Sequence, residues 1–262
     1  PYETHYPALG QHEQNPMDWW NAIVKSTKQV ITKADIDTND IECCGISGHS
    51  LGVVPLDKDC QLLRKGTPIW SDSRPDTQVP EFLEKINEEQ WYTTTGNGFP
   101  PALYSVFKIM WYRDNEPEMF KRVYRILGTK DFINFKLTGQ LFTDFSYASG
   151  TGVYDLLNWK YSDELISASG LSKDIFPEIV PATQVIGSLT PDAAKILGLN
   201  ESVKVVSGGV DNSCMALGAK AFKEGRVYNS LGSSSWIAVS SAKPLLNIRT
   251  RPYVFTHVVP GQ

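Results

Sequence analysis

The stretch GGVDNSCMALGAKAFKEGRVYNSLGSSSW, residues 208–236, places an aspartate and a glycine–serine turn on either side of a short alanine-rich segment. Asp211 is ionised at neutral pH, because an aspartate has an ordinary pKa of about 3.9, and it can accept the proton of an attacking hydroxyl. The turn over 232–235 carries little side-chain bulk, so its backbone N–H groups can approach phosphate oxygens. Together these features predict phosphoryl transfer to an alcohol.

The spacing allows the two features to meet. An apolar strand over 203–207, a glycine pair and a helix over 211–222 carry the chain away by ~15 Å at 1.5 Å per residue. A strand over 226–231 returns it by ~20 Å at ~3.3 Å per residue. We therefore expect the turn to lie close to Asp211. A structural alternative stays open, in which Asp211 or Asn212 only caps the helix and the turn only joins two strands.

The elements that must position these groups follow from hydrophobic periodicity, with proline near helix starts and glycine at helix ends. Helices are predicted over 16–30, 81–90, 105–126 with a break near Pro117, 129–139, 162–172 and 191–200. Strands are predicted over 40–47, 53–57 and 202–209, the first two meeting at a Gly-framed tip. The segment 143–155 is expected to be a loop. Strands that alternate with helices predict an α/β protein with a mixed sheet flanked by helices.

Composition argues against several partners. The 262-residue chain carries 25 Lys and Arg against 29 Asp and Glu, so it lacks the basic surface that a nucleic-acid binder needs. No apolar run approaches the ~20 residues of a membrane helix, and the first residues carry no secretory signal pattern. The four cysteines lack metal-binding spacing, and the adjacent pair Cys43–Cys44 is expected in a buried strand. These features predict a cytoplasmic protein that acts on a small molecule.

Six motifs, spread in order over almost the whole chain, resemble those of the FGGY carbohydrate kinases. The motifs are GQHEQNPMDWW, GISGHSLGVVPLD, PIWSDSR, LGTKDFINFKLTGQLFTDFSYASGTGVYD, GGVDNSCMALGA and NSLGSSSWI. The resemblance implies the ribonuclease-H-like, actin-like ATPase fold. It also implies ATP-dependent phosphorylation of a small sugar or polyol, with a pentulose such as xylulose as the leading candidate.

The resemblance further implies roles for residues of the last two motifs. Asp211 would be the general base, and Asn212 beside it would touch the sugar. Gly232, Ser233 and Ser234 would lie against the phosphates of ATP. Mg²⁺ would bridge the nucleotide oxygens, as in other phosphoryl-transfer enzymes.

On the sugar side, the resemblance assigns residues of two segments to substrate binding: His49, Ser50, Leu51, Trp70, Asp72 and Arg74. Imidazole, carboxylate and guanidinium groups supply the oriented donors and acceptors that a sugar needs. Structural alternatives stay open for each: a packing histidine, a core tryptophan and a local ion pair. The tip also departs from the Gln-Met-His of xylulose kinases and the Gln-Arg-Glu of glycerol kinases, so the sugar is not assigned.

The resemblance divides the chain near residue 223. Residues 1–223 would form the first, sugar-binding domain, nearly complete but without its first strands, and residues 224–262 would begin the nucleotide-binding domain. The family's first phosphate loop and its adenosine motif are absent from this sequence, so we expect this chain alone not to transfer phosphate.

Two questions about function stay open. Homodimers are common in the family, and no stretch of this sequence indicates an interface. A non-catalytic sugar-binding relative is the alternative to a kinase, and the intact Asp211 motif argues against it. The sequence has no G-x-G-x-x-G after a strand and no G-x-x-x-x-G-K-[ST], which argues against a dehydrogenase and a P-loop enzyme.

Overall fold

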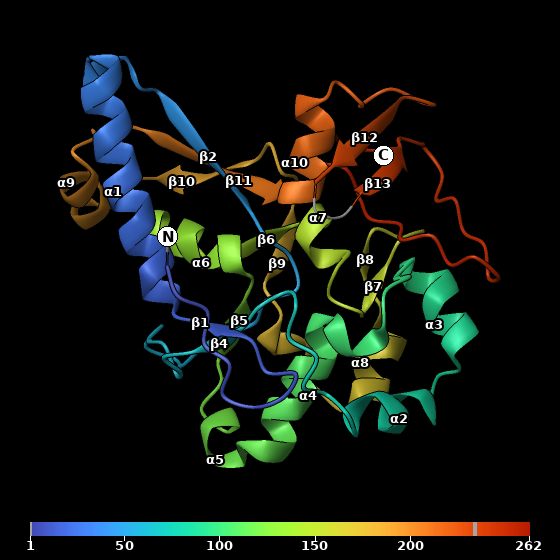
Figure 1. Ribbon diagram of the computed structural model, residues 1–262. Coiled ribbons are helices and arrows are strands. Elements are labelled where there is room, and N and C mark those ends of the chain that lie inside the picture. The colour runs from blue at the N-terminus through green and yellow to red at the C-terminus, as the bar shows by residue number, and fades with distance from the viewer. Residues whose placement is uncertain (1, 233–234) are drawn as a thin grey trace.

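The computed structural model describes residues 2–232 and 235–262 (Figure 1). Its central sheet has the strand order β10–β11–β2, formed by Val185–Ser188, Lys204–Val210 and Cys43–Gly48. β11 runs antiparallel to β10 and parallel to β2, and Val210 pairs with Gly48 at the end of the parallel pair. The predicted mixed sheet with flanking helices is confirmed.

Three helices pack together beside this sheet: α1 (Pro16–Ala34), α6 (Thr129–Thr138) and α9 (Pro191–Leu197). α6 contacts all three strands, and α1 and α9 both contact α6 (Figure 1). α1 begins where the sequence predicted, because Asn15 accepts a hydrogen bond from the backbone N–H of Met17 and Pro16 occupies the first turn. Their apolar faces form one hydrophobic core with the sheet.

A second hydrophobic core lies among a separate set of helices (Figure 1). These are α2 (Gln78–Leu83), α3 (Glu88–Thr95), α4 (Ser105–Asn115), α5 (Pro117–Phe120) and α8 (Asp163–Ser169). The predicted break at Pro117 is confirmed, but the helix predicted to continue to 126 is wrong, because α5 ends at Phe120 and Arg125–Leu127 forms a strand. The single helix predicted over 81–90 is wrong, because Asn87 starts a new helix by accepting a hydrogen bond from the Gln90 N–H at 2.8 Å.

Short strand pairs and turns connect the two cores. The pairs are β1 (Glu13–Gln14) with β4 (Thr67–Pro68), β3 (Val54–Leu56) with β5 (Arg125–Leu127), β6 (Phe142–Asp144) with β9 (Glu178–Val180), and β7 (Tyr154–Asp155) with β8 (Lys160–Tyr161). Short 3₁₀ turns cover Thr38–Asp40, Pro101–Leu103 and Lys173–Ile175. The segment predicted as a loop instead contains the end of β6, helix α7 (Phe145–Ala148) and β7.

The predicted pairing of the strands around residues 48–52 is wrong. β2 pairs with β11, whereas β3 pairs with β5. The physical reason is burial: Val53 packs in the helical core, while Val54 and Leu56 pack in the sheet core. Because β3 is buried on both faces, its backbone N–H and C=O groups need hydrogen-bond partners inside the protein. β5 supplies these partners.

The cysteine-containing strand is also less buried than predicted. In the described part of the chain, β2 pairs along one edge only and its exposure alternates. Cys44 and Ile46 pack against the sheet core, and Cys43 is exposed. The period of two along a strand explains this, because neighbouring side chains point to opposite faces.

The glycine pair forms an irregularity inside β11 instead of ending it. Gly208 has φ +68°, and a Cβ on it would lie 2.1 Å from the backbone oxygen of Ile46. A Cβ on Gly209 would lie 2.2 Å from a methyl group of Val258. Gly208 therefore allows the end of β11 to approach β2 closely, and Gly209 leaves room for the side chain of Val258.

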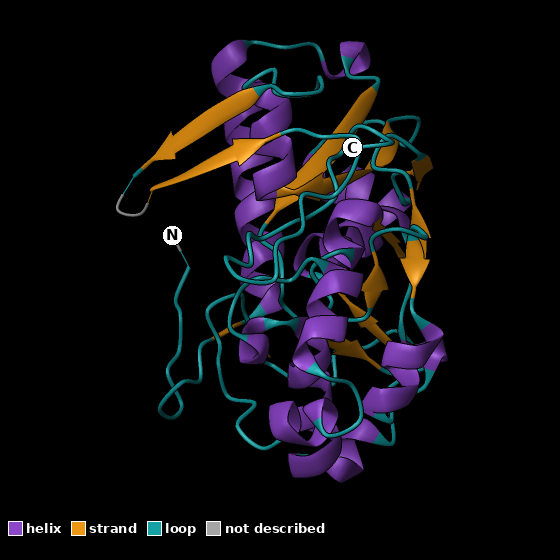
Figure 2. Cartoon of the chain, turned by 90° about the vertical axis from the view of Figure 1, so that its right-hand side faces the viewer, coloured by secondary structure: helices purple, strands orange, loops and turns teal. Residues whose placement is uncertain are grey.

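The last part of the chain forms a hairpin and then returns to the first part. β12 (Val227–Leu231) pairs with β13 (Ser235–Val239), and Figure 2 shows this hairpin extending from the body of the molecule. The returning segment accepts hydrogen bonds from Tyr92 at the Pro252 carbonyl (3.0 Å) and from Ser213 at the Thr256 carbonyl (2.8 Å). Across the described residues, none of the helices combines the length and apolar character needed to cross a lipid bilayer.

Candidate active site

Asp211 and His49 follow the carboxyl ends of the two parallel strands. β11 ends at Val210 and β2 ends at Gly48, and these two residues pair with each other. The next residue on each strand therefore emerges at the same edge of the sheet. Because ligands of open α/β sheets bind beyond the carboxyl ends of parallel strands, the topology brings the predicted base and the predicted sugar segment to the usual place for a site.

Asp211 is the first residue of α10 (Asp211–Gly218), which ends earlier than the predicted 222. The helix cap is Val210, and no side chain caps this end, so the expectation that Asp211 or Asn212 serves as the cap is wrong. The Asp211 side chain is exposed, and its Oδ1 accepts a hydrogen bond from the Asn212 N–H at 2.8 Å. Loss of water around the carboxylate raises its pKa from 3.8, which strengthens it as a proton acceptor.

The hairpin touches the start of α10 through Tyr228. Its hydroxyl donates to the Asn212 carbonyl at 3.2 Å. Gly232 is exposed and directly follows the end of β12, four residues beyond Tyr228, a distance of about 13 Å in an extended strand. Ser233 and Ser234 lie outside the described residues. The contact therefore holds the hairpin to α10, and Gly232, the first residue of the predicted phosphate turn, lies beyond that contact.

His49 is partly buried beside α1. Its ring packs edge-on against Trp19 with centroids 5.5 Å apart, and its Nδ1 lies 3.4 Å from the carbonyl oxygen of Ser50. Thr129 donates a hydrogen bond to the His49 carbonyl. Burial lowers the pKa of His49 to about 4, so the ring is neutral at pH 7 and carries one donor and one acceptor nitrogen.

Leu51 does not present its side chain to solvent. It has φ +64°, is 2% exposed and packs in the helical core, where its methyl group lies close to Gly150. Its backbone therefore turns the segment, and its side chain anchors that turn.

The second predicted sugar segment divides into exposed and buried parts. Trp70 is 55% exposed, so it does not fill the core. Asp72 is fully buried, and its Oδ2 accepts from Arg74 at 2.8 Å and from the His12 N–H at 2.7 Å. Arg74 also donates to Glu13 at 2.7 Å. The structure thus places Asp72 and Arg74 in a buried ion-pair network, and only Trp70 of the three faces solvent.

Lys108 joins the two predicted sugar segments, a link that sequence reasoning missed. Its fully buried ammonium donates to the carbonyl oxygens of Leu51 at 3.0 Å and Ile69 at 2.7 Å. Burial lowers the pKa of Lys108 to about 7, against the opposing effect of Asp72 and with a smaller contribution from Arg74. The signal available in the sequence was a lysine within an otherwise apolar run, Val106–Trp111.

We expect Lys108→Met to reveal the titration of this amine as a pH-dependent difference in stability. The folded pKa of about 7 lies below the ordinary 10.5, so between these values the unfolded chain binds more protons and the native protein gains stability as pH rises. The gain is at most about 1.4 kcal/mol per pH unit and is absent from the variant. Urea unfolding of both full-length proteins across this range measures it, and parallel stability curves would contradict the assignment.

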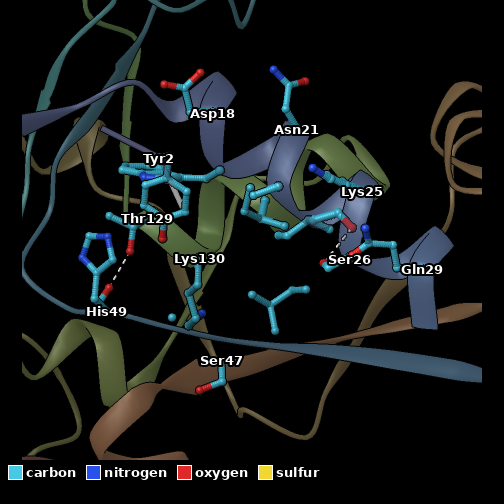
Figure 3. Close-up of a pocket in the computed structure, with 16 residues that line it drawn as sticks. Tyr2, Asp18, Asn21, Lys25, Ser26, Gln29, Ser47, His49, Thr129 and Lys130 are labelled. Carbon is cyan, nitrogen blue, oxygen red and sulfur yellow. Dashed lines mark hydrogen bonds between the residues drawn. The ribbon is translucent and has the colours of Figure 1, made fainter. Parts of the chain in front are cut away.

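A large hollow adjoins the site on the α1 side (Figure 3). It measures about 870 Å³, and its lining includes Ser47, His49, Thr129 and Lys130 together with one face of α1. Figure 3 shows His49 and Thr129 at one end and the polar side chains of Asn21, Lys25 and Gln29 at the other. Asp211 and residues 70–74 are not among the lining residues. The hollow therefore shares only His49 with the predicted sugar residues.

The described residues contain no group of three or more His, Cys, Asp or Glu side chains placed to hold a metal ion.

Comparisons with known proteins agree with this architecture. Xylulose kinase of Bacillus subtilis is 31% identical over 256 residues, which cover 96% of this chain and 51% of the relative. The crystal structure of xylulose kinase from Rhodospirillum rubrum matches all of this chain and 53% of its own, with a TM-score of 0.90 and 28% identity. Gluconate kinase from Lactobacillus acidophilus matches 95% of this chain and 50% of its own, with a TM-score of 0.87 and 25% identity.

The chain spans about half the length of these relatives. The model of the N-terminal domain of the FGGY family of carbohydrate kinases matches residues 1–218. The structural matches confirm the predicted actin-like ATPase fold. Because this family model matches most of its residues, the chain belongs to the FGGY family of carbohydrate kinases.

Proposed function

We propose that the protein phosphorylates a hydroxyl group of a small sugar or polyol, with a pentulose such as xylulose as the leading substrate. The observation that carries the proposal is the parallel register of β2 and β11, which places Asp211 beside the segment that begins at His49. Family membership and the xylulose kinase relatives support the same conclusion.

In this proposal Asp211 accepts the proton of the attacking hydroxyl. Its exposed side chain and raised pKa suit that role. Asn212 lies next to the base, and the neutral ring of His49 can both donate to and accept from sugar hydroxyls. The exposed ring of Trp70 offers a flat surface to the C–H groups of a sugar.

ATP, bound with Mg²⁺, would supply the phosphoryl group, and the metal would neutralise charge on the phosphates. The backbone N–H groups of residues 232–234 are the proposed contacts for those phosphates, as the glycine–serine sequence suggests. Closure of the hairpin toward Asp211 would be required, since Gly232 lies beyond the Tyr228 contact.

A substrate screen of the full-length protein tests this function. Purified protein with ATP and Mg²⁺ would be assayed for ADP release with ketoses, polyols and gluconate, and kcat/KM would be compared. We expect turnover with at least one ketose or polyol. Binding of a sugar without turnover of any compound would overturn the proposal and favour a non-catalytic sugar-binding protein.

A further inference from the structure

Three charged side chains form a fully buried cluster that contacts β11, the strand that precedes the proposed base. Lys130 on α6 donates to Asp131 at 2.5 Å and forms an ion pair with Asp144 at 2.9 Å, and none of the three is exposed. Burial lowers the pKa of Lys130, but the two carboxylates outweigh it and raise that pKa to about 12. Isolated buried charges are costly, so each member depends on the others.

The cluster reaches the backbone of β11 at two points. Lys130 and Asn134 both donate to the carbonyl oxygen of Ser207, at 3.2 and 2.7 Å. On the other side, Asp144 accepts a hydrogen bond from the hydroxyl of Ser146, and that hydroxyl in turn accepts from the Val210 N–H at 3.0 Å. Val210 is the helix cap that directly precedes Asp211.

These contacts fall where the strand ladder is irregular. The register between β11 and β2 shifts between Val206 and Gly209, and Gly208 has a positive φ. A regular ladder fixes the backbone by evenly spaced hydrogen bonds, and the irregularity interrupts that pattern. The Ser207 and Val210 contacts therefore hold the interrupted segment from both sides.

We propose that Ser146, oriented by the Lys130–Asp144 ion pair, is a positioning residue that fixes the Val210 N–H and thereby the direction in which Asp211 leaves the sheet. The inference rests on the proposed function, because it gives Asp211 the role of base. The Ser146 hydroxyl both donates and accepts a hydrogen bond. Because its hydrogen is donated to Asp144, its oxygen can accept from the Val210 N–H. A shift of about 1 Å in a reacting group can cost about 10²-fold in rate, so a small rotation of Val210 matters.

Ser146→Ala in the full-length protein tests the inference, with Ser169→Ala as the matched control. Ser169 is also fully buried, and its hydroxyl likewise donates to a carbonyl (Ile166, 2.6 Å) and accepts from a backbone N–H (Leu171, 3.3 Å). We expect Ser146→Ala to lower kcat about 10-fold or more and to change the sugar dissociation constant less than about 3-fold. Ser169→Ala should leave both nearly unchanged.

Ser146→Cys provides a second variant that keeps the side-chain shape but supplies only a weak acceptor, and it should also lower kcat. Equal kcat values for the Ser146 and Ser169 variants would overturn the inference. Asp211→Asn, assayed in parallel, separates the two levels: full activity of that variant would defeat the proposed role of Asp211, whereas its inactivity beside a fully active Ser146→Ala would defeat only the positioning role.

Discussion

Asp211→Asn should lower kcat for sugar phosphorylation by about 10²- to 10⁴-fold, because the amide cannot accept the proton of the attacking hydroxyl. Asparagine has the same shape and keeps an oxygen that can accept the Asn212 N–H bond, so the start of α10 should be retained. A coupled ADP-release assay would give kcat, and calorimetric titration with the sugar would show that binding survives.

The pH profile adds a second test of Asp211. Only the ionised carboxylate can act as the base, so kcat/KM should decline as pH falls through its pKa, and that pKa lies above 3.8 in the folded protein.

Asp192→Asn is the matched control for Asp211→Asn, because Asp192 is an exposed aspartate in the first turn of α9. A fall in kcat of similar size in both variants would show that the effect is not specific to Asp211.

Lys130→Met should reduce the free energy of unfolding by about 3–5 kcal/mol, which is the usual cost of removing one partner from a buried ion pair. The variant leaves Asp131 and Asp144 fully buried without a cation. Urea denaturation of the full-length protein at neutral pH would measure the loss. The loss should shrink as pH falls, because burial raises the pKa of Asp131 and a protonated Asp131 needs no cation.

Two further variants make this result specific. Changing Asp131 and Asp144 to Asn together with Lys130→Met removes the uncompensated charges, and most of the lost stability should return. Lys136→Met is the control, because Lys136 is on the same helix as Lys130. Its ammonium group lies 5.6 Å from the centroid of the Trp20 ring. That change should cost less than about 1 kcal/mol, because a partly exposed cation–π contact is weak. Equal losses at 130 and 136 would refute the special dependence on the buried cluster.

Local signals in the sequence predicted individual elements well. Asn15 and Pro16 start α1, Pro117 separates α4 from α5, and Gly139 and Gly198 end their helices as predicted. These features depend on residues within a few positions of one another. Strand pairing does not, and the predicted tip failed because the partner of β3 is β5, some seventy residues further along the chain.

The site was predictable in its residue types and less so in its contacts. The aspartate motif and the sugar segments could be located, and the parallel register then placed Asp211 beside His49. The sequence left open a local ion pair between Asp72 and Arg74, but it did not reveal that this pair is buried or that Lys108 links two loops. Both depend on burial, which is a property of the packed molecule and not of a local pattern.

The uncharged amine of Lys108 can make both hydrogen bonds that join the two loops. An ammonium group has three N–H donors and a neutral amine has two, and the two carbonyl acceptors on Leu51 and Ile69 require only two. Deprotonation would therefore remove a proton that neither of these bonds uses. A guanidinium could not make this change, so the lysine lets the two loops stay joined on either side of neutrality.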